Sequence, residues 1–294
     1  MKLDRSECNL TTLDPIPDGT TELYCHDNNL TSLPPLPSSL KRLICWGNDL
    51  TSLPPLPASL EFLHCNGNKL TSLPPLEHTS LTDLICANNS LSELPPLPAC
   101  LKTLHCDYNR LTRLPDFTRI PLTELYCTDN LLTVLSQLPN TLITLWCSNN
   151  PITSFQTLPD TITTLHCPRS MEKFPPNLVE LCCLEPNLHN YYNLPATLEI
   201  LKCSRNNLKY LYNLPRTLKY LTCYDNDRAY QDMPGYKLNN IFIGFKIVKL
   251  QRWWRKVSLE RKIRYKAPIN RAIEFKPELG IEWFKFLKRI SPLT

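Results

Sequence analysis

A segment of 20 or 21 residues recurs through most of this chain, and this repeat restricts the fold more than any other feature. One copy, from Leu43 to Leu60, reads Leu-x-Cys-x-x-Asn-x-Leu-Thr-Ser-Leu-Pro-Pro-Leu-Pro-x-Ser-Leu. Eleven copies can be aligned, and one step between them is shortened to 16 residues. The copies start at Leu23, Leu43, Leu63, Leu84, Leu104, Leu125, Leu145, Leu165, Leu181, Leu201 and Leu221. Repeats of this length indicate a solenoid, in which each copy packs only on its neighbours.

Each copy predicts one short strand. Leu23 and Cys25 are expected to point into the core and Tyr24 outward, because side chains alternate with period two along a strand. Strands from successive copies then pair side by side in a parallel sheet. The Asn of each copy is expected to turn the chain out of the strand and to satisfy backbone groups in the turn. The Leu-Pro-Pro-Leu-Pro segment predicts an extended, polyproline-like return leg on the convex side, without a helix.

The cysteines recur at the same place in every copy, from Cys25 to Cys223, and form a predicted ladder through the core. Unpaired Cys is a small, commonly buried residue, so the ladder is expected to be packing. A metal site needs ligands that converge on one point, which one Cys per copy does not provide. Cys182, next to the ladder residue Cys183, is expected to face outward and to be the only reactive thiol adjacent to the ladder.

The repeat pattern and the charge divide the chain into three regions. Residues 1–22 form a degenerate first repeat expected to cap the array, and residues 23–226 form the array itself. Residues 227–294 lack the pattern and hold 16 Lys and Arg against 6 Asp and Glu, a net charge of +10, whereas residues 1–226 hold 16 against 21, a net charge of −5. The short step near Cys167 predicts a local kink or a tight turn rather than a domain boundary.

The basic region predicts a C-terminal helical cap. Apolar residues recur near helical spacing over 240–266, and a second, shorter helix is expected over 278–290. The first helix carries a basic, Trp-containing surface whose central residues are Lys249, Arg252, Trp253, Trp254, Arg255 and Lys256. Part of it is similar to the calmodulin-binding IQ motif, and a helix of this kind could bind a calmodulin-like groove, an acidic membrane surface or nucleic acid. The alternative is a cap whose charges stay in water.

Aromatic and His side chains occupy outward positions on many of the predicted strands. Tyr and Trp are enriched at binding hot spots, so these residues predict a surface for a protein partner. The alternative is that neighbouring rings shield one another. The candidate partner-binding residues are Tyr24, Trp46, His64, His105, Tyr126 and Trp146.

Other function classes find little support. No Ser-His-Asp or Cys-His arrangement can be placed, and six Gly leave little room for a phosphate loop. We therefore expect no enzyme activity, no cofactor and no metal. The first residues lack the apolar run of a signal peptide and no stretch is long enough to span a membrane. With 14 Cys, this favours a reducing compartment, which we take to be the cytoplasm.

The repeat resembles the short leucine-rich repeats of bacterial effectors, and more closely the Cys-containing repeats of proteins from giant DNA viruses of amoebae. The resemblance covers about residues 3–226 and part of the tail, where Leu250 to Lys256 reads Leu-Gln-Arg-Trp-Trp-Arg-Lys. It implies an α/β-type, mostly β solenoid: a leucine-rich-repeat horseshoe with a parallel concave sheet. Some of those effectors carry a ubiquitin-ligase domain after the array, but residues 227–294 are too few for one. The resemblance thus implies a repeat-only interaction scaffold, with a ligase-associated adaptor or effector as the alternative.

Overall fold

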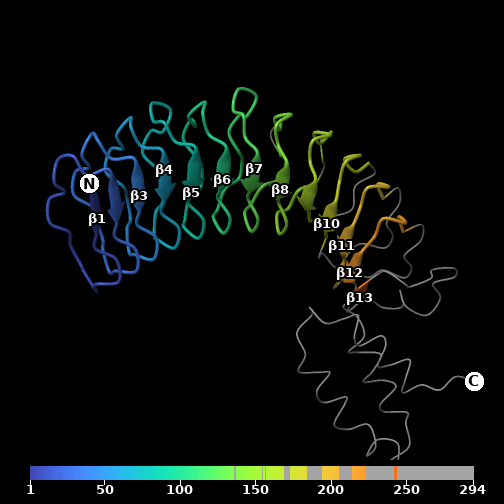
Figure 1. The fold of residues 1–294 in the computed structure, drawn as a ribbon, viewed down its shortest axis with the longest axis horizontal. Helices are drawn as coiled ribbons and strands as arrows, with labels where there is room; N and C mark the ends of the chain where they lie inside the picture. The colour runs from blue at the N-terminus through green and yellow to red at the C-terminus, as the bar shows by residue number, and fades with distance from the viewer. Residues whose placement is uncertain are drawn as a thin grey trace, which may run out of the picture.

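The computed structural model describes residues 1–135, 137–153, 155, 157–168, 173–183, 194–204 and 214–222, and the backbone of 242–243. Their strands form one parallel sheet of 13 strands that follow one another in chain order along a curved array (Figure 1). The strands are β1 (Lys2–Asp4), β2 (Glu22–Tyr24), β3 (Arg42–Ile44), β4 (Phe62–His64), β5 (Asp83–Ile85), β6 (Thr103–His105), β7 (Glu124–Tyr126), β8 (Thr144–Trp146), β9 (Thr164–His166), β10 (Glu180–Cys182), β11 (Ile200–Lys202), β12 (Tyr220–Thr222) and β13 (Phe242–Ile243).

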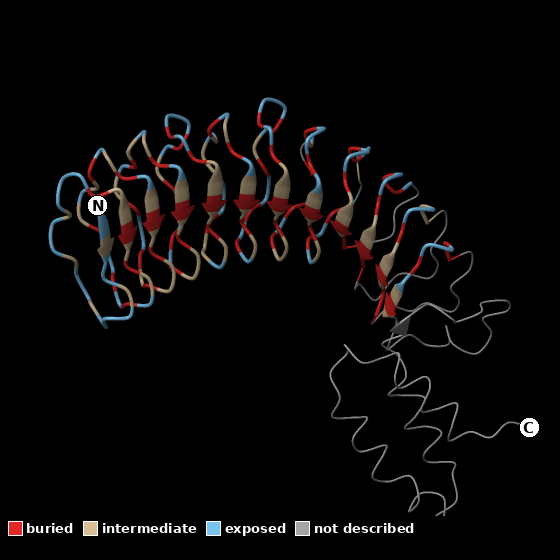
Figure 2. Ribbon diagram, viewed as in Figure 1, coloured by how far each residue is buried: buried red, intermediate tan, exposed pale blue. Residues whose placement is uncertain are grey.

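The predicted alternation along each strand is confirmed. From β2 to β12 the middle residue is a buried Leu, and the first residue of each strand stays partly exposed (Figure 2). Register is kept from strand to strand; Leu104, for example, lies between Leu84 and Leu125. The strands therefore place one row of Leu in the core and leave two rows of side chains on the other face of the sheet.

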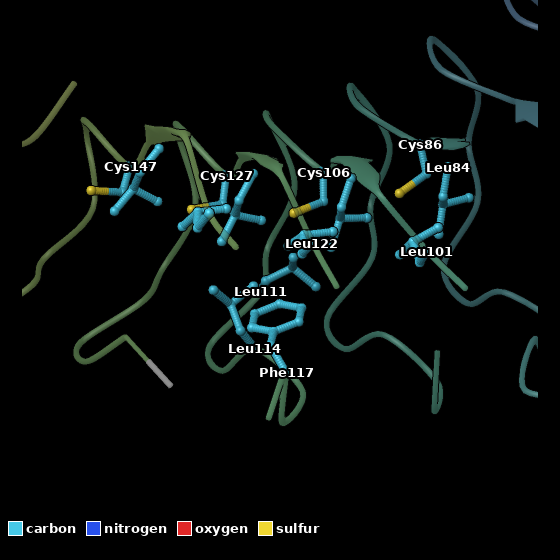
Figure 3. Packing of buried hydrophobic residues seen from close by; sticks show 14 of the residues in the cluster. Leu84, Cys86, Leu101, Cys106, Leu111, Leu114, Phe117, Leu122, Cys127 and Cys147 are labelled. Atoms are coloured by element: carbon cyan, nitrogen blue, oxygen red, sulfur yellow. The ribbon is translucent and has the colours of Figure 1, made fainter. Parts of the chain in front are cut away.

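The cysteine ladder is part of the core, as predicted. Cys86, Cys106, Cys127 and Cys147 lie in a row beside the buried leucines, and all four are 0% exposed (Figure 3). Burial raises the pKa of such thiols, to about 12 for Cys65. These sulfurs therefore behave as packing atoms.

In the described repeats from Asn28 to Asn150, the Asn of the turn joins two repeats. Asn48 donates from Nδ2 to the carbonyl oxygens of Cys25 at 2.9 Å and Cys45 at 3.2 Å, and its Oδ1 accepts from the backbone N of Leu30 at 3.0 Å. The same bonds recur at Asn68, so the amide satisfies backbone groups of its own repeat and of the preceding one. This confirms the predicted role of the Asn.

The return legs are extended, and the part of the chain that the structure describes contains no helix. Each leg ends in a tight turn, such as the one in which the Leu40 N donates to the Pro37 carbonyl at 3.1 Å. Leu56 and the bulkier Phe117 hold the same place in their legs, and both side chains are buried in the core. Pro fixes φ and removes a donor, which explains why these legs do not coil.

The shortened step does not interrupt the sheet. Leu165 of β9 pairs with Leu181 of β10 in the same register as the other repeats. The shortening falls in residues 169–172, which lie outside the described residues. The predicted kink or tight turn therefore stays a prediction.

The sheet extends past the point where the repeat pattern ends. Phe242 and Ile243 pair in parallel with Tyr220 and Leu221 as β13, so the predicted helix over 240–266 is wrong at its start. Without β13, the edge of β12 would offer backbone hydrogen bonds to a following segment. The aromatic Phe242 and the β-branched Ile243 favour a strand there. The rest of the predicted helix, the second helix and the proposed helical cap lie outside the described residues.

Candidate partner-binding surface

The open face of the sheet is the face formed by the first and third residues of each strand, pointing away from the Leu and Cys core. The residue after each ladder Cys continues this face. All six candidate residues lie there, and all are partly exposed rather than fully in solvent. Except at Tyr24, their rings contact other rings of this face, which shield part of their surface.

The N-terminal aromatic cluster consists of His26, Trp46, Phe62 and His64. His26 stacks on Trp46 with ring centroids 4.6 Å apart, and Trp46 lies 6.0 Å from His64. Phe62 meets His64 edge-on, and the Arg42 guanidinium lies 4.1 Å over the Phe62 ring. The cluster bridges β2, β3 and β4 and already holds one cation.

The central aromatic cluster consists of His105, Tyr126, Trp146 and His166. The ring centroids are 4.0 Å apart for His105 and Tyr126, 4.9 Å for Tyr126 and Trp146, and 4.1 Å for Trp146 and His166. Four consecutive strands, β6 to β9, supply one ring each. The buried Trp146 Nε1 has no hydrogen-bond partner among the described residues. This cluster is a continuous row of rings with an unused donor.

The six candidates thus do not form one row. Ile85 of β5 lies in register between His64 and His105 and separates the two clusters. Tyr24 belongs to neither cluster. Its hydroxyl donates to the Glu22 carboxylate at 2.9 Å, and the Lys2 ammonium lies 4.1 Å over its ring. His26, Phe62 and His166 were not among the candidates, although their positions beside Trp46, His64 and Trp146 in the repeat register could have identified them.

Carboxylates surround the central aromatic cluster. Asp83 and Glu124 are the first residues of β5 and β7, while Asp107 and Asp129 follow the ladder cysteines of β6 and β7. Each accepts a hydrogen bond from an uncharged donor, as when the Thr128 N donates to Asp107 Oδ1 at 2.9 Å. Burial raises the pKa of Asp107 to about 6. The cluster is therefore an aromatic surface within an acidic rim.

Three histidines of the open face have a lowered pKa. Burial lowers the pKa of His64, His105 and His166, although Asp83 and Glu124 oppose the effect at His105 and Glu180 opposes it at His166. These rings are therefore mostly neutral at pH 7 and add little positive charge to the face.

Cys182 faces outward as predicted, but the expectation that it is a reactive thiol is wrong. Its side chain lies in the outward row, but it is only 4% exposed. In the sheet it stands between the longer His166 and Lys202, and the Glu180 carboxylate reaches both, at 3.4 and 2.7 Å. This polar bridge accompanies the burial of the short thiol, and burial raises its pKa to about 12.

We therefore expect Cys182 to react slowly with iodoacetamide in the folded protein. The thiolate is the reacting species, so a raised pKa and a covered sulfur both slow alkylation. Mass spectrometry of tryptic peptides should show at least about tenfold slower labelling than at the exposed Cys8. Equal rates at the two cysteines would show that the bridge over Cys182 is open in solution.

Two further groups of residues could hold a ligand: an acidic cluster near the N-terminus and the basic C-terminal segment. Glu7, His26 and Asp27 each offer one atom within 4.8 Å of the others, a grouping that the sequence analysis did not identify and that lies at an exposed turn. The central residues of the basic, Trp-containing surface lie outside the described residues; they are Lys249, Arg252, Trp253, Trp254, Arg255 and Lys256. Within the described ranges, no helix is long and apolar enough to cross a membrane.

Comparison with known proteins agrees with the fold. A family description, "Leucine Rich repeats (2 copies)", matches residues 38–78 and 58–99. The chain is similar to YopM from Yersinia enterocolitica, with 30% identity, a TM-score of 0.62, and coverage of 83% of this chain and 64% of that one. It is also similar to YopM from Yersinia pestis, described as a leucine-rich effector protein, with 28% identity, a TM-score of 0.58, and coverage of 77% and 78%.

A third similar structure shows the fold alone. The leucine-rich-repeat domain of APL1B has 21% identity and a TM-score of 0.62, with coverage of 77% of this chain and 76% of that one. A search of curated proteins gave no significant match. The repeat, the parallel solenoid and these neighbours agree: the chain is a leucine-rich-repeat protein, with structural neighbours among bacterial effectors.

Proposed function

We propose that this chain is a non-enzymatic scaffold that binds a protein partner on the open face of its sheet. Leucine-rich-repeat folds are typical of protein–protein interaction domains, and solenoids offer extended surfaces for this purpose. A cytoplasmic, reducing location belongs to the same proposal, since the ladder thiols pack as core residues in their reduced form.

The observation that carries the proposal is the central aromatic cluster. It exposes part of Tyr126 and Trp146 on a flat sheet face, side by side with neighbouring rings that fix their orientation. Large rings held rigidly contribute binding area at little cost in conformational entropy, which is why Tyr and Trp dominate hot spots. Mutual shielding of the rings, the alternative from the sequence, explains their partial burial, but it leaves part of Tyr126 and of Trp146 exposed on the face.

We expect the double substitution Tyr126→Ala and Trp146→Ala, here termed the face variant, to abolish capture of the partner from cell lysate. Loss of one hot-spot residue costs about 2 kcal/mol or more, which is about 30-fold in affinity, so the double substitution should weaken binding by more than about 30-fold. Quantitative mass spectrometry of proteins captured by the immobilised full chain measures the loss.

The matched control is the leg variant, Leu131→Ala with Val134→Ala, which truncates two exposed apolar side chains on the return leg after β7. It should retain every partner. Circular dichroism of both variants checks that each is folded. A folded face variant that captures the same proteins as the wild type would contradict the proposal.

A further inference from the structure

The charge of the open face indicates what kind of partner it fits. Over β4 to β8, neither the strand residues nor the two residues after each ladder Cys include Lys or Arg. The same positions hold four carboxylates, those of Asp83, Asp107, Glu124 and Asp129. The charge at these positions is therefore only negative and comes from β5 to β7, whereas β3 contributes Arg42, which covers the Phe62 ring of β4.

These carboxylates are not neutralised within the described part of the chain. Among its residues, no Lys or Arg nitrogen lies within 4.0 Å of any of the four, whereas Glu61, Glu93, Glu180 and Glu199 each have a cationic partner. The donors they do use are hydroxyl, amide and backbone groups. Asp107 shows the consequence: it is partly buried without a cation, and its pKa rises to about 6. A cation arriving from outside would relieve this cost.

The aromatic rings favour the same ligand. Tyr126 shares β7 with Glu124, and Trp146 lies beside Tyr126 in register on β8. Their partly exposed rings can take an ammonium or guanidinium by cation–π contact. The carboxylates of β5 to β7 are spread over about 10 Å across the sheet by the strand spacing, so they suit several side chains on one segment better than one ion. The four carboxylates also do not form a metal site. Among the described residues, three possible ligand atoms come within 4.8 Å of one another only at Glu7, His26 and Asp27.

We infer that the acidic aromatic patch, formed by Asp83, Asp107, Glu124, Asp129, Tyr126 and Trp146, binds a basic segment of a partner protein through its Arg or Lys side chains. The inference rests on the proposed function, because it specifies the chemistry of the partner for the same face. Carboxylates would bind the cationic groups while the rings pack against their aliphatic stems and charged ends.

The test uses the full chain and a fluorescein-labelled nona-arginine peptide, with fluorescence anisotropy as readout. We expect saturable binding that weakens with added salt, and at least about tenfold weaker binding of the same peptide with citrulline in place of arginine. Citrulline keeps the shape of the side chain and removes its charge. Absence of binding, or equal binding of the two peptides, would overturn the inference.

The patch variant, Asp107→Asn with Glu124→Gln, locates the site. Both substitutions remove charge and keep a hydrogen-bond acceptor, and we expect at least about a tenfold loss of affinity for nona-arginine. The matched control, Glu77→Gln with Glu93→Gln, removes two charges from exposed residues of the return legs and should bind as the wild type does. Equal losses in both variants would reveal only a general charge effect and would also overturn the inference.

The chain's own basic segment is the competing occupant. A peptide of residues 247–266, with eight Lys and Arg and one Glu, serves as a competitor in the same assay. If it displaces nona-arginine at least tenfold more strongly than a scrambled peptide of the same composition, the patch binds the chain itself and the assignment to a partner falls. Loss of partners in the face variant but not in the patch variant would leave the proposed function standing and remove only the basic ligand.

Discussion

Replacement of Leu104 by Ala is expected to destabilise the array by about 2–5 kcal/mol. Leu104 is the middle residue of β6, is 0% exposed, and lies in register between Leu84 and Leu125. Truncation removes apolar contacts on both sides and leaves a cavity between repeats that cannot collapse without moving the sheet. Because each repeat packs only on its neighbours, the loss should unfold the repeats around β6 first.

Urea denaturation followed by circular dichroism measures this change. The control is Lys69→Ala, which removes an exposed ammonium paired with Asp49 at 2.7 Å. Surface pairs of this kind contribute little, so the control should stay within about 0.5 kcal/mol of the wild type. If Lys69→Ala proved more costly than Leu104→Ala, the assignment of inward and outward residues would be wrong.

Replacement of Asn68 by Ala should cost about 2–4 kcal/mol, although it deletes only one small polar side chain. Asn68 donates to the carbonyls of Cys45 and Cys65 at 3.0 and 3.1 Å and accepts from the Leu50 N at 3.0 Å. Alanine would leave these backbone groups buried and without partners, which costs more than the bonds themselves contribute.

The same urea experiment checks this prediction, with Asn29→Ala as its control. Asn29 follows Asn28, the buried turn Asn of its repeat, but the side chain of Asn29 is exposed. We expect the control to change the free energy of unfolding by less than about 0.5 kcal/mol. A similar, small effect at Asn68 would mean that water replaces the amide in the turn.

The sequence predicts the repeating parts of the molecule well because every copy faces the same constraints. Leu-x-Cys can bury two side chains only as a strand, Pro excludes a helix from the legs, and a buried turn needs an amide with both donors and acceptors. Eleven copies in one register therefore specify strand, core and turn together. The likeness to giant-virus repeat proteins, the three-region division and the C-terminal helices beyond β13 stay predictions.

The sequence does not predict features that depend on contacts between side chains that differ from one repeat to the next. Cys182 is in the expected row, but it is buried beside a bridge from Glu180 to His166 and Lys202, which no single repeat reveals. The sequence does not predict β13, because this strand pairs through its backbone with β12 after the repeat pattern has ended. Ring contacts depend on side-chain rotamers, so the sequence gives the row of candidates but not its division into two clusters at Ile85.

The most direct test of partner binding on the open face compares the face variant with a tail variant in one capture experiment. The tail variant, Lys249→Gln, Arg252→Gln, Arg255→Gln and Lys256→Gln, removes four positive charges from the basic segment of the full chain. Captured proteins are compared by quantitative mass spectrometry. We expect the tail variant to keep the partners that the face variant loses. Loss of those partners in the tail variant, with retention in the face variant, would make the basic segment the recognition element and the array its support.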